Sequence, residues 1–90
     1  MKTVVLDGNT ITRIEEIYDL LAQELAFPDW FGRNLDALYD CLTDVSEDVR
    51  IEIAGKDSLA FTLGWRGDVL FRLLSDAADQ NRHLSVSVLS

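Results

Sequence analysis

Two short segments of this chain alternate strictly between apolar and polar residues, and they limit its fold more than any other feature. In residues 49–53 (VRIEI) and 84–88 (LSVSV), every second side chain is apolar. Alternation of this kind is typical of strands in a sheet that has one packed face and one face open to water. A parallel sheet covered on both faces would instead show continuous apolar runs. The pattern therefore predicts a two-layer α/β architecture.

Helical periodicity and turn signals place the other elements. Thr12 and Glu15 form a capping-box pattern for a first helix, which must end before Pro28. Strands separated by helices imply parallel pairing, so we expect a small three-stranded parallel sheet with about four helices packed on one face. The expected elements are a strand over 2–6, a helix with an apolar stripe from Ile14 to Leu25, a helix from Leu35, a strand over 49–53, a short helical turn over 58–62, a helix opened by Asp68 with Val69, Leu70, Leu73, Leu74 and Ala77 inward, and a strand over 84–88.

Length and composition bound the class of protein. Ninety residues, 48% of them apolar, suffice for one modest core, so we expect a single domain over residues 1–90. No apolar run approaches the ~18 residues that a membrane span needs, and the apolar start is broken at Asp7, too soon for a signal-peptide core. The single cysteine cannot form an internal disulfide. We therefore expect a cytoplasmic protein that does not bind membranes.

The charge balance is acidic and locally concentrated. Sixteen acids against eight bases give a net charge of −8, and residues 29–52 hold seven acids but only Arg33 and Arg50 as bases. Nucleic acid is a poor partner for such a surface, because counterion release needs cationic side chains on the protein. Solubility alone is the alternative explanation of this acidity, and composition by itself leaves that alternative open. The clustering favours a basic protein as partner.

Residues 30–42 (WFGRNLDALYDCL) carry the strongest functional signal. Asn34 is suited to cap the helix that follows. The helix dipole favours Asp36 in the first turn but not Asp40, and the two carboxylates repel by a few tenths of a kcal/mol. Such a face is typical of a surface kept for a cationic partner. The helix periodicity places Asp36, Tyr39, Asp40 and Thr43 on this outward face and Leu35, Leu38, Leu42 and Val45 on the core face.

Acid–base or metal chemistry by Asp36 and Asp40 is the enzymatic alternative. Exposed carboxylates stay ionised and make poor general acids, and no second catalytic motif accompanies this pair. Cys41 borders the apolar face and is expected to be a small core residue. His83, the only histidine, and a lone cysteine do not make a metal site. We therefore expect no enzymatic activity, no metal, no cofactor and no small-molecule substrate.

Three other features have structural explanations. The tripeptide Asp57-Ser58-Leu59 resembles the attachment motif of acyl carrier proteins, but it follows an alternating strand, whereas those proteins are helical bundles. Trp65 is expected to pack near the start of the last helix. Adjacent loop aromatics do not easily point the same way, so of Trp30 and Phe31 we expect one in the core and one near the binding face.

The segment aromatic-aromatic-Gly-x-Asn-Leu-Asp-Ala-Leu-aromatic-Asp-Cys-Leu resembles the barstar family, small intracellular inhibitors of secreted bacterial ribonucleases. The resemblance extends to the opening strand, the helix before Pro28 and the closing Val88-Leu89-Ser90. It implies an immunity protein whose acidic helix blocks the basic active-site cleft of a guanyl-preferring extracellular ribonuclease. By resemblance, Asp40 enters the central phosphate pocket with Asp36 beside it. The implied contact set is Trp30, Gly32, Asn34, Leu35, Asp36, Tyr39, Asp40, Thr43 and Asp76.

This chain departs from the family pattern at a few positions. Arg33 is basic where the best-known member has an acid, and Tyr39 replaces a tryptophan. Asp76 matches an acidic contact only if the following loop has a one-residue insertion. These departures suggest a different cognate nuclease, with an acidic spot near its cleft. The alternative function is a barstar-like domain that neutralises another basic protein, such as a toxin that is not a ribonuclease, because fold does not fix function.

Overall fold

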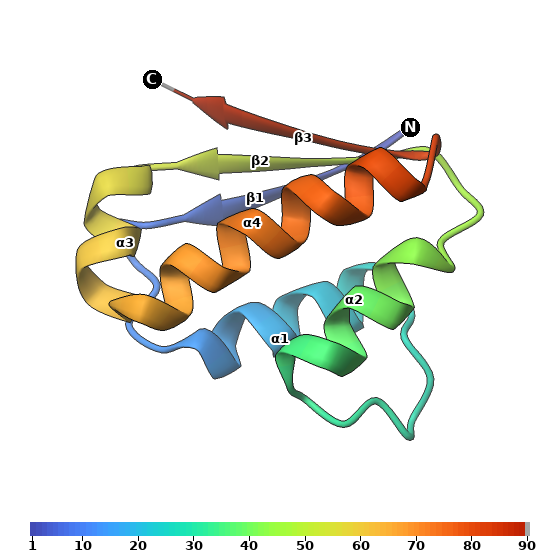
Figure 1. The fold of residues 1–90 in the computed structure, drawn as a ribbon, viewed down its shortest axis with the longest axis horizontal. Coiled ribbons are helices and arrows are strands. Elements are labelled where there is room, and N and C mark those ends of the chain that lie inside the picture. Colours follow the sequence, from blue (N-terminus) through green and yellow to red (C-terminus); the bar gives the residue numbers. More distant parts are fainter. Residues whose placement is uncertain (90) are drawn as a thin grey trace.

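Three strands lie side by side in one parallel sheet (Figure 1). The computed structural model describes residues 1–89, so Ser90, included in the expected domain, lies outside the described residues. Strand β2 (Val49–Ala54) lies between β1 (Lys2–Asp7) and β3 (Leu84–Leu89). Val4 is paired in register with Ile51, and Ile51 with Val86. The expected three-stranded parallel sheet is confirmed.

Four helices connect the strands and cover one face of the sheet (Figure 1). Helices α1 (Ile14–Glu24) and α2 (Leu35–Thr43) lie between β1 and β2 in the chain, and α3 (Lys56–Leu63) and α4 (Trp65–Gln80) lie between β2 and β3. Helix α1 contacts β1, α4 contacts β3, and α2 packs against α4. The predicted two-layer α/β architecture is confirmed.

Strand β2 alternates between core and solvent as its sequence predicts, with Ile51 and Ile53 buried and Arg50 exposed. Strand β3 departs from its predicted alternation: Leu84 is buried, but Val88 is 51% exposed near the end of the chain. In β1, Leu6 is completely buried, and Val5 on the open face is 45% exposed. A single layer of helices cannot cover both faces of a sheet, so apolar as well as polar residues on the open face meet water.

Helix α1 begins differently from the predicted capping box of Thr12 and Glu15, which is wrong by one position. Arg13 occupies the N-cap with extended backbone, because Ile14 is the first residue whose side chain enters the core. The returning carboxylate is that of Glu16, whose Oε2 accepts hydrogen bonds from the backbone N–H of Thr12 (2.6 Å) and Arg13 (3.1 Å). These bonds stabilise the ionised form and hold the pKa of Glu16 below its usual value.

The expected short turn over 58–62 is a longer helix, α3, and the last helix starts earlier than expected. Helix α3 begins directly after Gly55, whose φ of +61° lies in the left-handed region that favours glycine. Helix α4 begins at Trp65, three residues before Asp68. Gly67 lies inside α4. A Cβ there would lie 3.1 Å from Cβ of Leu63, so the glycine lets α3 and α4 approach closely.

Two predicted packing residues of α4 are exposed instead. Trp65 is 67% exposed and Val69 is 37% exposed, so their expected inward placement is wrong. The rotation of the helix is set by Leu70 and Leu74, which are completely buried, and both misplaced residues lie to the side of that stripe. The guanidinium of Arg66 covers the Trp65 ring, 5.1 Å from its centroid.

Asn81, which follows α4, ties the end of α2 to the rest of the fold. This residue is 6% exposed, and its Nδ2 donates to the carbonyl oxygens of Leu42 (3.0 Å) and Val45 (2.8 Å). Its Oδ1 accepts from the backbone N–H of His83 at 2.9 Å. The carbonyl groups at the end of α2 have few partners within the helix, so this side chain satisfies them from a distant part of the chain.

Replacing Asn81 by alanine should lower the free energy of unfolding by about 1–3 kcal/mol, because buried carbonyl oxygens lose their donors. Urea unfolding measures the change. Gln80→Ala is the matched control, since Gln80 is exposed on the preceding turn and should shift the midpoint little. Equal stability of the two variants would show that the Asn81 bonds do not hold the end of α2.

Candidate functional site

Helix α2 and the loop before it bring most of the expected contact residues together. Asn34 is the N-cap as predicted, and its Oδ1 accepts a hydrogen bond from the backbone N–H of Ala37 at 2.8 Å. Its Nδ2 donates to the carbonyl oxygen of Gly32 at 3.3 Å. A Cβ at Gly32 would lie 2.9 Å from this nitrogen, so a larger residue would have to displace the Asn34 amide. The start of the helix is thus fixed by its own side chain and linked to the loop.

The two carboxylates of α2 face solvent. Asp36 and Asp40 are both exposed, one helical turn apart, and no ion pair among residues 1–89 involves either of them. On the opposite side of the helix, Leu38 and Leu42 are completely buried. The core therefore holds α2 in a rotation that leaves both negative charges exposed to solvent.

The other expected contact residues on α2 are less exposed than the carboxylates. Tyr39 and Leu35 are half-buried and pack against the core, so each offers only part of its surface. Thr43 is also half-buried, and its hydroxyl donates to the carbonyl oxygen of Asp40 at 3.0 Å. These three side chains frame the carboxylates and also stabilise the helix that carries them.

The loop before α2 is anchored by one aromatic residue and exposes the other. The Phe31 ring meets those of Phe27 and Tyr18 edge to face, with centroids 5.1 Å and 6.1 Å apart. Trp30 is 78% exposed. The predicted division of the pair is confirmed for burial, with Phe31 inward and Trp30 outward. Contact between Trp30 and a partner stays a prediction.

Arg33 is engaged within the protein. Its guanidinium pairs with the carboxylate of Asp19 on α1 at 3.0 Å. The two residues are fourteen positions apart in the sequence, and sequence reasoning missed this contact. Its φ of +51° lies in the left-handed region, as does that of Ala26 at +53°. Such positive φ angles at residues other than glycine are uncommon, so the surrounding contacts hold the loop in a strained shape.

Asp76 is the outlying member of the expected contact set. It is exposed on α4, the helix against which α2 packs. Its neighbour Ala77 is completely buried, so the side of α4 that carries Ala77 faces the core. Whether Asp76 reaches the same partner as Asp40 stays a prediction.

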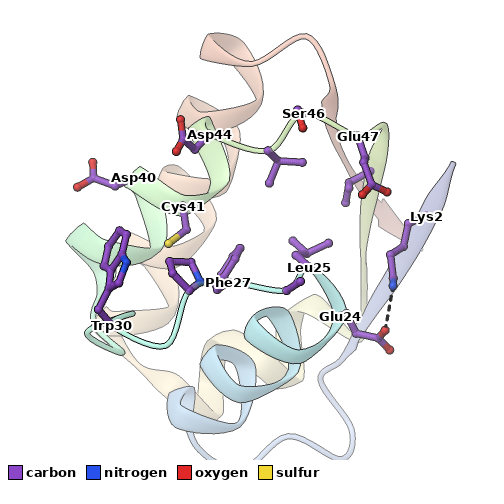
Figure 2. A pocket seen from close by; sticks show the side chains of 14 residues that line it. Lys2, Glu24, Leu25, Phe27, Trp30, Asp40, Cys41, Asp44, Ser46 and Glu47 are labelled. Atoms are coloured by element: carbon purple, nitrogen blue, oxygen red, sulfur yellow. Dashed lines mark ion pairs between the residues drawn. The ribbon is translucent and has the colours of Figure 1, made fainter.

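A pocket of about 410 Å³ lies beside the exposed face of α2, and sequence reasoning did not foresee it (Figure 2). It is bounded by the end of α1, the loop after it, the second half of α2 and the chain leading to β2. Asp40 and Trp30 stand at one side of it, and Cys41 lines its wall. Burial raises the pKa of the Cys41 thiol above its usual value, and the nearby charges of Asp40 and Asp44 raise it further.

Within residues 1–89, no three or more His, Cys, Asp or Glu side chains gather as metal ligands would. The helices of that same stretch are too short or too polar to cross a bilayer. His83 instead lies 3.0 Å from the carboxylate of Asp48.

Cys41 is 8% exposed, as expected for a small core residue, and its truncation gives a test of that role. Cys41→Ala should lower the free energy of unfolding by about 1–2 kcal/mol and leave partner binding nearly intact. Thermal unfolding and a binding titration measure the two effects. Loss of binding with an unchanged thermal midpoint would instead indicate a mechanism that uses the thiol.

Comparison with known proteins agrees with this geometry. A relative from Bacillus subtilis (strain 168), named "Putative ribonuclease inhibitor YrdF", is 51% identical over 43 residues, which cover 48% of this chain and 47% of the relative. The match thus spans about half the length of that relative. The family described as "Barstar (barnase inhibitor)" matches residues 1–89. With this match over its fold and its acidic helix, the chain belongs to the Barstar (barnase inhibitor) family.

Proposed function

We propose that this chain inhibits a basic, secreted, guanyl-preferring bacterial ribonuclease by covering its active-site cleft with the exposed face of α2. One observation carries the proposal: Asp36 and Asp40 are exposed and without ion-pair partners among residues 1–89, on a helix whose opposite side carries the completely buried Leu38 and Leu42. Family membership supports an inhibitor of a ribonuclease. The class of nuclease and the identity of the contact residues go beyond what family membership supports and are our proposal.

The chemistry of the cleft explains why carboxylates would block it. A ribonuclease must hold a phosphate with cationic side chains, and carboxylate oxygens accept the same charge-assisted hydrogen bonds as phosphate oxygens. Asp40, in the middle of α2, is assigned the phosphate position itself. Asp36 lies nearer the start of the helix and is assigned a place at the edge of the cleft.

The rigidity of the site favours tight binding. The Asn34 cap fixes the start of α2, the Phe31 cluster anchors the loop, and the Arg33–Asp19 ion pair joins that loop to α1. Side chains and loops that are already ordered lose little entropy when they dock. The exposed Trp30 then adds a large apolar contact beside the charged centre.

Capture of the partner tests the class of protein. The tagged chain, incubated with secreted proteins of its host, should retain a basic nuclease at low salt and at physiological salt, identified by mass spectrometry. The captured enzyme should lose RNA cleavage when the chain is added. Retention of a basic protein without nuclease activity would contradict the ribonuclease assignment and support the alternative target, a toxin of another kind.

Asp40→Ala should cause the largest loss of affinity of any single substitution, because it leaves several buried cations of the nuclease without a counter-charge. The expected loss is about 2–5 kcal/mol, a range that is partly informed by the related barnase–barstar complex. Asp36→Ala should weaken binding less, because its carboxylate lies nearer the rim. Titration of the captured nuclease with each variant measures both losses.

The matched control for these variants is Asp57→Ala, which removes the same charge from α3 at the other end of the sheet (Figure 1). It should leave affinity close to wild type, while thermal unfolding of Asp36→Ala and Asp40→Ala should show no loss of stability. Wild-type affinity in Asp40→Ala would place the interface elsewhere. Unfolding of that variant would make the carboxylate structural.

The acid-rich stretch of residues 29–52 should also steer the partner during approach. Stopped-flow measurements should show that the association rate constant falls steeply from low salt to above physiological salt, while the dissociation rate constant changes less, because salt screens long-range attraction more than buried contacts. The barnase–barstar pair is a known case of such steering, so the expectation is carried over from a relative. An association rate constant that is flat across this range would remove the electrostatic part of the proposal.

A further inference from the structure

Strand β3 has an open edge. In the sheet that residues 1–89 form, it pairs with β2 on one side and has no partner strand on the other (Figure 1). The ladder between them includes a hydrogen bond from the backbone N–H of Val49 to the carbonyl oxygen of His83 at 2.8 Å. Alternate residues of a parallel strand bond to the same neighbour, so the N–H and C=O groups of Val86 and Val88 point away from β2. These groups are available to another strand.

The apolar core stops short of this edge. Leu6, Ile53 and Val88 are paired in one row across the sheet, on the side that faces the helices. Leu6 and Ile53 are buried, whereas half of Val88 is exposed. Val86, in the row before, is only half-buried. Apolar surface therefore lies next to the free backbone groups of β3.

The features that usually prevent edge pairing are missing from β3. Natural sheets protect their edges with charged side chains, prolines or bulges. Strand β1, at the opposite edge, has charged residues at both ends, and one of them, Lys2, pairs with Glu24 of α1 at 3.5 Å. Strand β3 has the sequence LSVSVL, with no charge and no proline, and its register with β2 is unbroken. In a chain of net charge −8, this edge is where two copies can approach without placing like charges in contact.

The edge of β3 is complementary to itself. In an antiparallel pair with a two-fold axis through its centre, Val86 lies opposite Val86 of the second copy, and Leu84 lies opposite Val88. Apolar side chains then meet on the helix-facing side, and Ser85 meets Ser87 on the open side. The outward N–H groups of Val86 and Val88 find the outward carbonyl groups of Val86 and Leu84. A shift by one residue would place apolar side chains opposite serines, so the pattern favours this register.

We infer that two copies of this chain associate through β3, antiparallel and with Val86 opposite Val86, into one continuous sheet. The contact runs along one strand of six residues and is small beside the roughly 800 Å² per partner of a standard interface, so the dimer forms reversibly. Figure 1 shows β3 at the edge of the sheet away from α2. Both copies of the proposed nuclease-binding face therefore stay open in the dimer.

Sedimentation equilibrium of the whole chain at rising concentration measures this association. The average mass should rise from that of one chain toward that of two. Added salt should strengthen the dimer, because it screens the repulsion between two chains that each have a net charge of −8. This salt dependence is opposite to the one expected for association with a basic nuclease. A dimer that salt weakens would indicate contact between opposite charges and hence a different surface.

A matched pair of lysine variants locates the contact. Val88→Lys should raise the dissociation constant of the dimer about tenfold or more, because the two-fold axis places the new charge in the contact twice. Val5→Lys adds the same charge to the other edge strand, at a residue of similar exposure, and should not weaken the dimer. Both variants lower the net negative charge equally, so general repulsion cannot explain a difference. Circular dichroism of each should match wild type.

Hydrogen exchange of the wild-type chain tests the pairing without any substitution. The amides of Val86 and Val88 should exchange quickly in dilute solution and be protected in concentrated solution, because only the second copy supplies their acceptors. The amides of Ser85 and Ser87, which point toward β2, should be protected at both concentrations.

Three results would overturn the inference. One is a mass that stays at that of a single chain at every concentration. Another is equal weakening of the dimer by Val88→Lys and Val5→Lys, which would place the contact away from the edge of β3. The third is protection of the Val86 and Val88 amides only after the captured nuclease is added, which would assign this edge to the nuclease instead of a second copy.

Discussion

The burial of one side of α2 is the constraint on which the rest of this structure depends. Leu38 and Leu42 are completely buried, and the burial of each leucine contributes about 1.5–3 kcal/mol. With that side fixed, Asp36 and Asp40 have no alternative but to face solvent. Asn81 adds the second attachment by accepting and donating hydrogen bonds between the end of α2 and the chain before β3. A helix held at its side and at its end presents its charges in one geometry.

That rigid presentation links the fold to inhibition. The two acids of α2 repel each other weakly, and the core compensates for this through the leucines behind them. Arg33, in the loop before α2, is paired with Asp19, so its charge is partly balanced within the protein. That ion pair and the aromatic contacts of Phe31 anchor the loop that carries Trp30. Affinity would then depend on charge complementarity more than on ordering of the inhibitor.

Local sequence patterns were enough to predict the sheet, the cap by Asn34 and the two faces of α2. The sheet and the helix faces follow from the spacing of apolar residues, and the cap follows from the residue type at the start of the helix. Sequence patterns failed where contacts between residues far apart in the chain determine the structure. Helix α4 was expected to open at Asp68, but it begins at Trp65, and its Gly67 packs against α3. Trp65 was expected inside, but the rotation of α4 is set by leucines further along. The pocket beside α2 is lined by the start of β1, the end of α1 and the second half of α2. These segments are distant in the sequence, so no local pattern predicts that they line one pocket.

The most direct test of the account is whether the chain and a phosphate ligand compete for the nuclease. The dissociation constant of the chain for the captured nuclease would be measured by titration at rising concentrations of guanosine 3′-phosphate. If α2 covers the phosphate site, the apparent dissociation constant of the chain should rise linearly with the concentration of guanosine 3′-phosphate. The slope of that rise should match the affinity of guanosine 3′-phosphate for the nuclease. A constant that does not change, with both molecules bound to the enzyme together, would contradict the claim that α2 occupies the active-site cleft.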